Sequence, residues 1–157
     1  MRKKIISGSY QKQEKLINNN WLNIDNIAEV EITSENERHP IESALILDSS
    51  SGWVAGEEGM QTIRIVFNTP QNIQKVMLKF SELSHERTQE YVLNWYTENG
   101  ESHEIVRQQW NFSPDGSSIE VENHHVNFSN VSVLELCINP NISSNNSTAS
   151  LDQLRIA

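Results

Sequence analysis

The 157-residue chain has few of the residues that mark special architectures. Its single cysteine, Cys137, excludes an intramolecular disulfide and favours a reducing compartment. No apolar run approaches the roughly 20 residues of a membrane-spanning helix, and the pair Ile5–Ile6 is too short for the core of a signal peptide. From these absences we expect a cytoplasmic protein without a membrane span.

Motifs of the common catalytic sites are also missing. The six glycines are scattered singly, which excludes a glycine-rich loop that cradles phosphate, and neither Gly-x-Ser-x-Gly nor Cys-x-x-Cys occurs. Glu57 and Glu58 lie between glycines, where two acids could serve as general acid and general base, but neighbouring acids in a loop are usually solvated. The neighbours in His103–Glu104 and in His124–His125 point to opposite strand faces, so neither pair can converge on a metal ion. We therefore expect no enzyme activity.

Basic residues are scarce relative to acidic ones. The chain has 12 Lys and Arg against 21 Asp and Glu, which gives a formal net charge of -9. Such a field repels phosphate backbones and anionic membranes, so nucleic acid is not an expected partner. Four basic residues near the start, at positions 2, 3, 4 and 12, could form an electrostatic arm, but a solvated terminus is the simpler interpretation.

What the sequence does have is period-two alternation. Apolar residues alternate with other side chains over 62–67 and again over 76–80, which is typical of half-buried antiparallel strands. A turn is expected between them, at Asn68–Pro70. Similar segments predict further strands at 27–33, 87–96, 102–113, 119–128, 134–138 and 149–156.

These segments predict an all-β protein. Asn99–Gly100 suits the positive φ angles of a tight hairpin, and no long helix alternates with the strands. About eight or nine short antiparallel strands fit a jelly-roll β-sandwich. We expect one such domain over residues 21–157, preceded by a polar lead over 1–20 that is either a short helix or mobile.

Several pieces in order resemble one known family. Ala44 is followed four residues later by Asp48, then by Gly52–Trp53, the two alternating strands and the closing segment Ala149–Ile156. This order resembles the discoidin, or coagulation factor 5/8 C-type, domains, which are galactose-binding-like β-sandwiches, and the resemblance covers roughly residues 27–157. Related sandwiches bind sugars, lipid headgroups, proteins or DNA through different loops. The resemblance implies a non-catalytic binding module, with a carbohydrate as the leading ligand and a protein interaction or assembly partner as the alternative.

Sugar sites in such modules combine exposed aromatic rings with polar side chains that engage hydroxyl groups. The candidates for ligand binding are Trp53, Glu57, His85, Arg87, Arg107, Trp110 and Asn111. Each has a structural alternative: the family's tryptophan at the position of Trp53 generally packs under its loop, and Arg87 and Arg107 can pair with glutamates. A shallow sugar site would bind weakly and would gain from multivalency, but the sequence leaves the oligomeric state open.

The resemblance also raises the question of a metal. Many galactose-binding-like modules hold a structural calcium ion through loop oxygens near an aspartate and through an acid in the closing strand. Asp48 matches the first position, whereas Gln153 stands where the resemblance would place the acid. A structural calcium ion at Asp48 is therefore possible but not predicted, and no other cofactor is expected.

Overall fold

A computed structural model describes residues 21–49 and 51–157, so the predicted polar lead lies outside the described residues. Almost all of the regular structure is β-strand. The elements are α2 (Ile24–Ile27), β1 (Ala28–Ile32), α3 (Glu42–Leu45), β2 (Trp53–Glu58), β3 (Gln61–Ser81), β4 (Arg87–Tyr96), β5 (Ser102–Phe112), β6 (Ile119–Asn139), β7 (Thr148–Leu151) and β8 (Gln153–Ile156). No helix of the described residues is long and apolar enough to cross a membrane.

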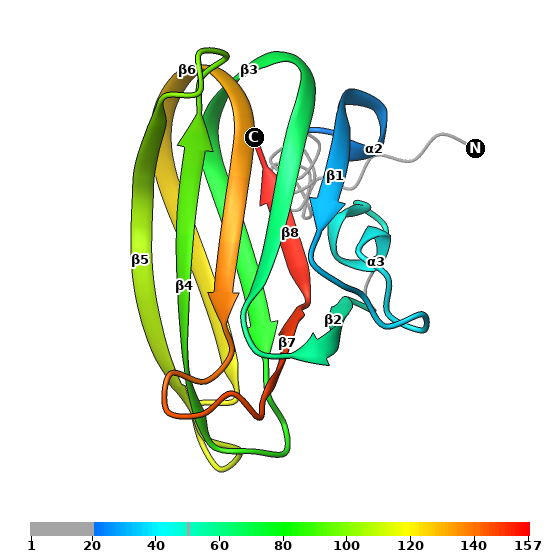
Figure 1. Cartoon of the computed structure of the whole chain (residues 1–157), viewed down its shortest axis with the longest axis vertical. Helices are drawn as coiled ribbons and strands as arrows, with labels where there is room; N and C mark the ends of the chain where they lie inside the picture. The colour runs from blue at the N-terminus through cyan, green and yellow to red at the C-terminus, as the bar shows by residue number, and fades with distance from the viewer. Residues whose placement is uncertain (1–20, 50) are drawn as a thin grey trace, which may run out of the picture.

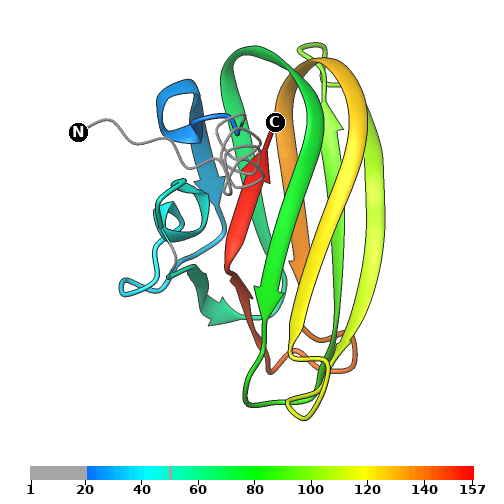
Figure 2. The same cartoon turned by 180° about the vertical axis from the view of Figure 1, so that it is seen from behind.

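The strands form a two-layered sandwich (Figures 1 and 2). The first layer has the order β1–β3–β6–β4–β5, and all of its strands are antiparallel. The second layer contains the other halves of β3 and β6, with β8 paired to residues 76–79 of β3. A separate ribbon of β2 and β7 lies near one end of the sandwich (Figure 1).

Two long strands connect the layers. β3 pairs with β6 on both sides of an irregular stretch between Val66 and Lys75, and it arches from one layer to the other there (Figure 1). The predicted turn at Asn68–Pro70 thus lies within a single bent strand, and the two predicted strands belong to opposite layers. β6 bends in the same way near Asn130, whose φ of 60° lies in the left-handed region that asparagine tolerates. The predicted strands at 119–128 and 134–138 are therefore also halves of one strand.

The core fills the space between the layers. Alternation along β3 and β4 sends every second side chain inward, and burial of each large apolar side chain contributes about 1.5–3 kcal/mol. Phe80 and Tyr91, from different layers, have ring centroids 5.4 Å apart. The strands contribute Ile63, Ile65, Phe67, Ile73, Val76, Leu78, Phe80, Tyr91, Leu93, Leu134, Leu136, Ile138, Leu154 and Ile156. The predicted all-β sandwich is confirmed.

Candidate functional site

A pocket of about 440 Å³ opens where the start of β4 meets the end of β5 and the loop after β6. Antiparallel pairing sets Arg87 opposite Phe112 and Thr88 opposite Asn111. The loop is held to β4 because the Ile142 amide donates to the Thr88 carbonyl at 2.9 Å. The pocket is lined by Glu86, Arg87, Thr88, Asn111, Phe112, Ser113, Asn141 and Ser143. We refer to it as the end pocket.

Arg87 supports the floor of the end pocket. Its side chain is 2% exposed; Nε donates to Glu82 Oε1 at 2.8 Å, and Nη1 donates to the Pro140 carbonyl at 2.7 Å and to Gln89 Oε1 at 3.2 Å. The guanidinium carbon lies 4.6 Å from the centre of the Phe112 ring, within cation–π range. Arg87 thus joins β4, β5 and the loop after β6.

The contact with Arg87 changes the pKa of Glu82. Burial alone would raise the pKa of its carboxyl group, but hydrogen bonds from Arg87 and from the Ser84 amide outweigh burial and lower the pKa. The pair is therefore charged near neutral pH. Of the two interpretations of Arg87, the structure shows the ion pair, while the residue also lines the pocket.

The rim of the end pocket is made of amides and hydroxyls. Asn111 is exposed, and its Oδ1 accepts from Thr88 Oγ1 at 2.7 Å. Asn141 Oδ1 accepts from the Ser143 amide at 3.1 Å, and Asn141 Nδ2 donates to Ser147 Oγ at 3.4 Å. Side chains held in this way present fixed donors and acceptors, which is how a concave site orients a polar ligand.

Aromatic side chains contribute less to this pocket than expected. Phe112 is buried beneath Arg87. Trp110 is half-buried on the inner face of β5, and its Nε1 donates to the Ser117 carbonyl at 3.2 Å. The pocket is therefore mainly polar.

Trp53 lies elsewhere. It begins β2 rather than lying in a loop, it is 1% exposed, and its Nε1 donates to the Ser34 carbonyl at 3.1 Å. Neither face of a buried indole is open for a sugar to stack on, so we leave Trp53 out of the candidate site and favour the packing interpretation. Glu57 is exposed on β2 and is absent from the lining of the end pocket.

Arg107 lies on the outer face of the first layer. Its Nη1 donates to Glu90 Oε1 at 3.0 Å, and its Nη2 donates to Glu104 Oε1 at 3.1 Å. Hydrogen bonds from Gln109 and Arg107 lower the pKa of Glu90. Arg107 is thus engaged in an exposed ion-pair network away from the pocket. His85 is 80% exposed, two residues before Arg87, with Nδ1 3.9 Å from Glu82 Oε2.

Of the predicted residues, Arg87 and Asn111 line the end pocket together. Trp110 precedes Asn111 directly, and His85 lies two residues before Arg87. Sequence reasoning missed Thr88, Asn141 and Ser143. The segment 139–147 shows the usual signal of a polar loop, but only the fold brings it against β4.

A second polar cluster lies deeper between the layers. Gln89 Nε2 donates to Glu120 Oε1 at 3.4 Å, and Tyr91 OH lies 2.8 Å from His124 Nε2. This cluster could not be predicted from the sequence, because polar residues at inward strand positions resemble the outward ones on the same strand. His124 thus points inward while His125 is exposed, as expected for neighbours on a strand.

The loop after α3 contains Asp48, where the family resemblance places a calcium ligand. Asp48 is exposed, and the closing strand supplies the neutral amide of Gln153. Residues 21–49 and 51–157 contain no group of three His, Cys, Asp or Glu side chains placed to hold a metal ion. The carbonyl oxygens of Ala44 and Ile46 accept hydrogen bonds from Arg155. With two loop carbonyls bound to Arg155 and an amide in place of the acid, the oxygens present do not fit the calcium site that the resemblance implies around Asp48.

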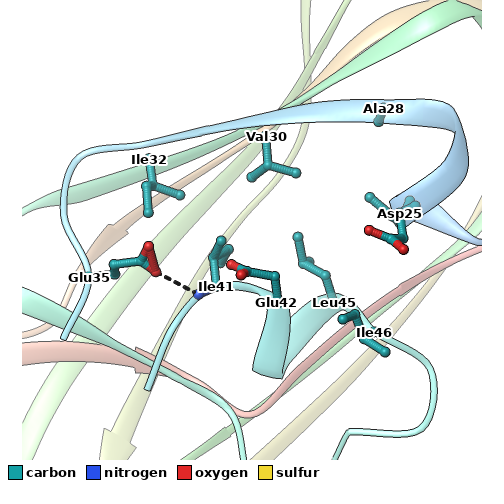
Figure 3. Close-up of a pocket in the computed structure, with 10 residues that line it drawn as sticks. Asp25, Ala28, Val30, Ile32, Glu35, Ile41, Glu42, Leu45 and Ile46 are labelled. Carbon is teal, nitrogen blue, oxygen red and sulfur yellow. Dashed lines mark hydrogen bonds between the residues drawn. The ribbon is translucent and has the colours of Figure 1, made fainter. Parts of the chain in front are cut away.

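A groove of about 400 Å³ separates β1 from α3. Figure 3 shows aliphatic side chains from both elements facing one another, with carboxylates around them. Glu35 Oε2 accepts from the Ile41 amide at 3.1 Å. The lining residues are Ile24, Asp25, Ala28, Val30, Ile32, Glu35, Ile41, Glu42, Leu45 and Ile46. They include no aromatic residue and none of the residues predicted to bind sugar.

Several solved structures with the same fold are carbohydrate-binding modules. The third family 32 module of a family 31 glycoside hydrolase from Clostridium perfringens superposes with a TM-score of 0.62 at 15% identity, covering 87% of this chain and 93% of that one. The chain has the fold of the family 32 carbohydrate-binding modules. The expected discoidin-like, galactose-binding-like β-sandwich is therefore confirmed.

Two further neighbours of this fold were solved with sugars. The family 32 module of NanJ from C. perfringens, in complex with galactose, has a TM-score of 0.59 at 13% identity and covers 87% of this chain and 96% of that one. The family 32 module of AlyQ, in complex with 4,5-unsaturated mannuronic acid, has a TM-score of 0.57 at 16% identity and covers 83% and 95%. No protein-family model and no curated protein matches this chain.

Proposed function

We propose that this chain is a non-catalytic carbohydrate-binding module and that it binds sugar in the end pocket. The observation that carries the proposal is the convergence of fixed amide and hydroxyl groups from β4, β5 and the loop after β6 around one concave site. Neighbours of the same fold bind galactose and an unsaturated uronic acid, which supports a sugar as the ligand class.

In this proposal each group has a distinct role. Asn111, Thr88 and Asn141 exchange hydrogen bonds with sugar hydroxyls, and Ser143 adds a further hydroxyl at the rim. Arg87 positions β4 and the loop, because its Nε and Nη1 donate to protein acceptors. A polar site without an exposed aromatic face makes few apolar contacts, so binding of a single sugar is weak. Several copies acting together would raise the avidity.

Binding rather than catalysis is proposed because of the carboxylates at the site. Most glycosidases use two carboxyl groups that flank the scissile bond. Among the described residues that line the end pocket, Glu86 is the one carboxylate. The cytoplasmic location, expected from the lack of a long apolar run and from the single cysteine, stays part of this proposal, and localisation of the tagged full chain in its native cell would test it.

The test is a glycan array probed with the purified full chain, with and without calcium. Asn111→Ala and Asn141→Ala remove rim amides, whereas Gln109→Ala removes an amide from the outer face of the same strand, β5. We expect selective binding that the two rim variants lose and the Gln109 variant keeps. A blank array, or equal binding by all variants, would contradict the proposal.

The alternative is a protein-interaction module, and the groove between β1 and α3 is the surface that favours it. Ile46 is 41% exposed and Leu47 38% exposed beside this groove, with Glu42 at its edge. A segment with aliphatic side chains next to lysine or arginine would match these features. Labelled peptides of that composition should bind the full chain and bind Glu42→Lys more weakly; no binding would count against this alternative.

A further inference from the structure

Arg155, in the closing strand β8, spans from the C-terminal end of the chain to the loop that follows α3. Leu154 and Ile156 point into the core, so Arg155 lies on the opposite face of β8, where its side chain meets α3 and is buried, with the residue only 5% exposed. Nη1 donates to the Ala44 carbonyl at 2.7 Å and to the Leu154 carbonyl at 2.9 Å, and Nη2 donates to the Ile46 carbonyl at 3.1 Å. One guanidinium group thus joins segments that lie more than a hundred residues apart in sequence.

The acceptors are carbonyl groups that need a partner. α3 has four residues, and the last carbonyls of any helix have no partner within the helix. Ala44 is buried, and a buried carbonyl without a hydrogen bond destabilises the fold. Ile46 O also accepts from the Ser49 amide at 3.0 Å, so the guanidinium completes a bonded turn. Arg155 therefore satisfies the backbone of this loop.

The charge of Arg155 is balanced by backbone oxygens. None of the ion pairs found in residues 21–49 and 51–157 includes it. Burial lowers the pKa of the guanidinium, but arginine retains its proton in proteins. A buried cation surrounded by carbonyl oxygens is the environment that proteins otherwise offer to hard metal ions.

We infer that the Arg155 guanidinium is the fixed internal cation of this sandwich and takes the structural role of the calcium ion expected from the family resemblance. The loop oxygens that precede Asp48 are bound by Arg155, and the closing strand offers Gln153 in place of an acid. A calcium ion at the same oxygens would meet like-charge repulsion from the guanidinium. The fold of this chain therefore does not depend on a divalent metal.

The contacts of Arg155 also hold one wall of the groove in Figure 3. Leu45 and Ile46 form part of the wall of this groove. Arg155 binds the carbonyl oxygen of Ile46 and that of Ala44, the residue before Leu45. Gly52 is fixed to the same region because its amide donates to the Ser43 carbonyl at 3.2 Å. Loss of the guanidinium should loosen residues 42–49 before it affects the distant strands β4 and β5.

The experiment measures thermal unfolding of the full chain in EDTA and in millimolar calcium. The variants are Arg155→Met, Arg155→Lys and, as a matched control, Arg107→Met, which removes an exposed arginine from the outer face. Hydrogen exchange is followed separately for residues 42–49 and for β4 and β5. Terbium luminescence, excited through tryptophan, reports any divalent-type site in the wild-type chain.

We expect the wild-type Tm to be the same in EDTA and calcium, with no sensitised terbium emission. Arg155→Met should lower the Tm by several degrees and speed hydrogen exchange in residues 42–49, while β4 and β5 stay protected. The Tm of Arg155→Lys should lie between those of Arg155→Met and wild type, and the Tm of Arg107→Met should equal that of wild type. A calcium-dependent rise in the wild-type Tm would overturn the inference, as would an Arg155→Met variant as stable as Arg107→Met. If Arg155→Met does not fold, the wild-type calcium comparison and Arg155→Lys still decide.

Discussion

The Tyr91 hydroxyl and His124 Nε2 lie 2.8 Å apart between the two layers of the sandwich. Tyr91 comes from β4 in the first layer and His124 from the half of β6 in the second, so their contact is a polar link between the layers, next to the one between Gln89 and Glu120. Burial lowers the pKa of His124, although the charge of Glu122 opposes the change. The imidazole is therefore neutral in the folded protein near neutral pH.

The first prediction concerns acid sensitivity from His124. Because its folded pKa is below its unfolded pKa, its contribution to stability is present above the unfolded value and is lost as pH falls through the lower, folded value. His124→Gln should remove this part of the decline in urea-denaturation stability below pH ~6.5, the usual histidine pKa. An unchanged slope in that variant would show that the decline comes from other groups.

Tyr91→Phe tests the same contact at constant pH. The substitution removes one hydroxyl and keeps the ring that packs on Phe80. We expect a loss of about 0.5–1.5 kcal/mol of unfolding free energy near neutral pH, the typical net value of one hydrogen bond. Urea denaturation measures this loss, and a variant of equal or greater stability would contradict the bonded arrangement.

Glu120 is a second titrating group, and the stability that it contributes depends on pH in the opposite direction to that of His124. Its side chain is buried against Gln89, and Oε2 has no hydrogen-bond partner in the described part of the chain. Burial, together with the neighbouring Glu122, raises its pKa from 4.5 to about 8. A raised folded pKa means that stability is fully present below the unfolded value and falls as pH rises through about 8.

Glu120→Gln should therefore flatten the alkaline side of the stability profile. The neutral amide matches the shape of the protonated carboxyl and does not ionise. We expect the variant to equal wild type near pH ~5 and to exceed it clearly near pH ~9, because each unit of pKa shift corresponds to about 1.4 kcal/mol. The measurement is urea denaturation at both pH values; parallel profiles for the two proteins would refute it.

The strands could be predicted because alternation is a local property. Ile63, Ile65 and Phe67 point inward as their spacing indicates. A hairpin also forms at the predicted place, but Gly100 alone has the positive φ, 82°, that was expected for both Asn99 and Gly100, and the Gly100 amide donates to the Thr97 carbonyl at 3.0 Å. The arching of β3 and β6 could not be predicted, because a turn residue such as Pro70 marks a change of direction without showing whether the strand ends. Layer assignment depends on pairing partners that are far apart in sequence.

The candidate site was predictable only in part, for a related reason. Arg87 and Asn111 stand out as polar residues on strands, and β4–β5 pairing brings them together across a hairpin. Asn141 comes from a loop about fifty residues away, and no local pattern indicates that this loop covers the start of β4. Residue type also did not reveal burial: Trp53 and Arg107 are both typical sugar-binding residues, yet one packs inside and the other pairs with glutamates.

The fourth prediction separates the buried from the exposed arginine. Arg87→Met leaves the Glu82 carboxylate without its partner and removes the donor to the Pro140 carbonyl. Breaking a buried ion pair by removing one partner typically costs about 3–5 kcal/mol. Arg107→Met, the exposed counterpart, should leave the stability unchanged within error. Thermal and urea unfolding of both variants provide the comparison, and equal losses would contradict the role assigned to Arg87.

The final prediction concerns the close approach of β2 to the segment after β1. A Cβ atom at Gly56 would lie 2.7 Å from the Glu35 carbonyl oxygen, a distance that forces the backbone to shift. The Gly56 amide also donates to Ser34 Oγ at 2.9 Å, which fixes the strand against that segment. Gly56→Ala should therefore destabilise the fold by about 1–3 kcal/mol, the usual cost of overpacking.

Gly116→Ala is the matched control for Gly56→Ala, because a Cβ atom there meets no atom within 4 Å. It should change the Tm little, whereas Gly56→Ala should lower the Tm and weaken the ordering of residues 34–36, which hold Trp53 through the Ser34 carbonyl. Tryptophan fluorescence reports this second effect. If both variants melt alike, β2 has room to move away from Glu35, and the burial of Trp53 does not depend on the close approach at Gly56.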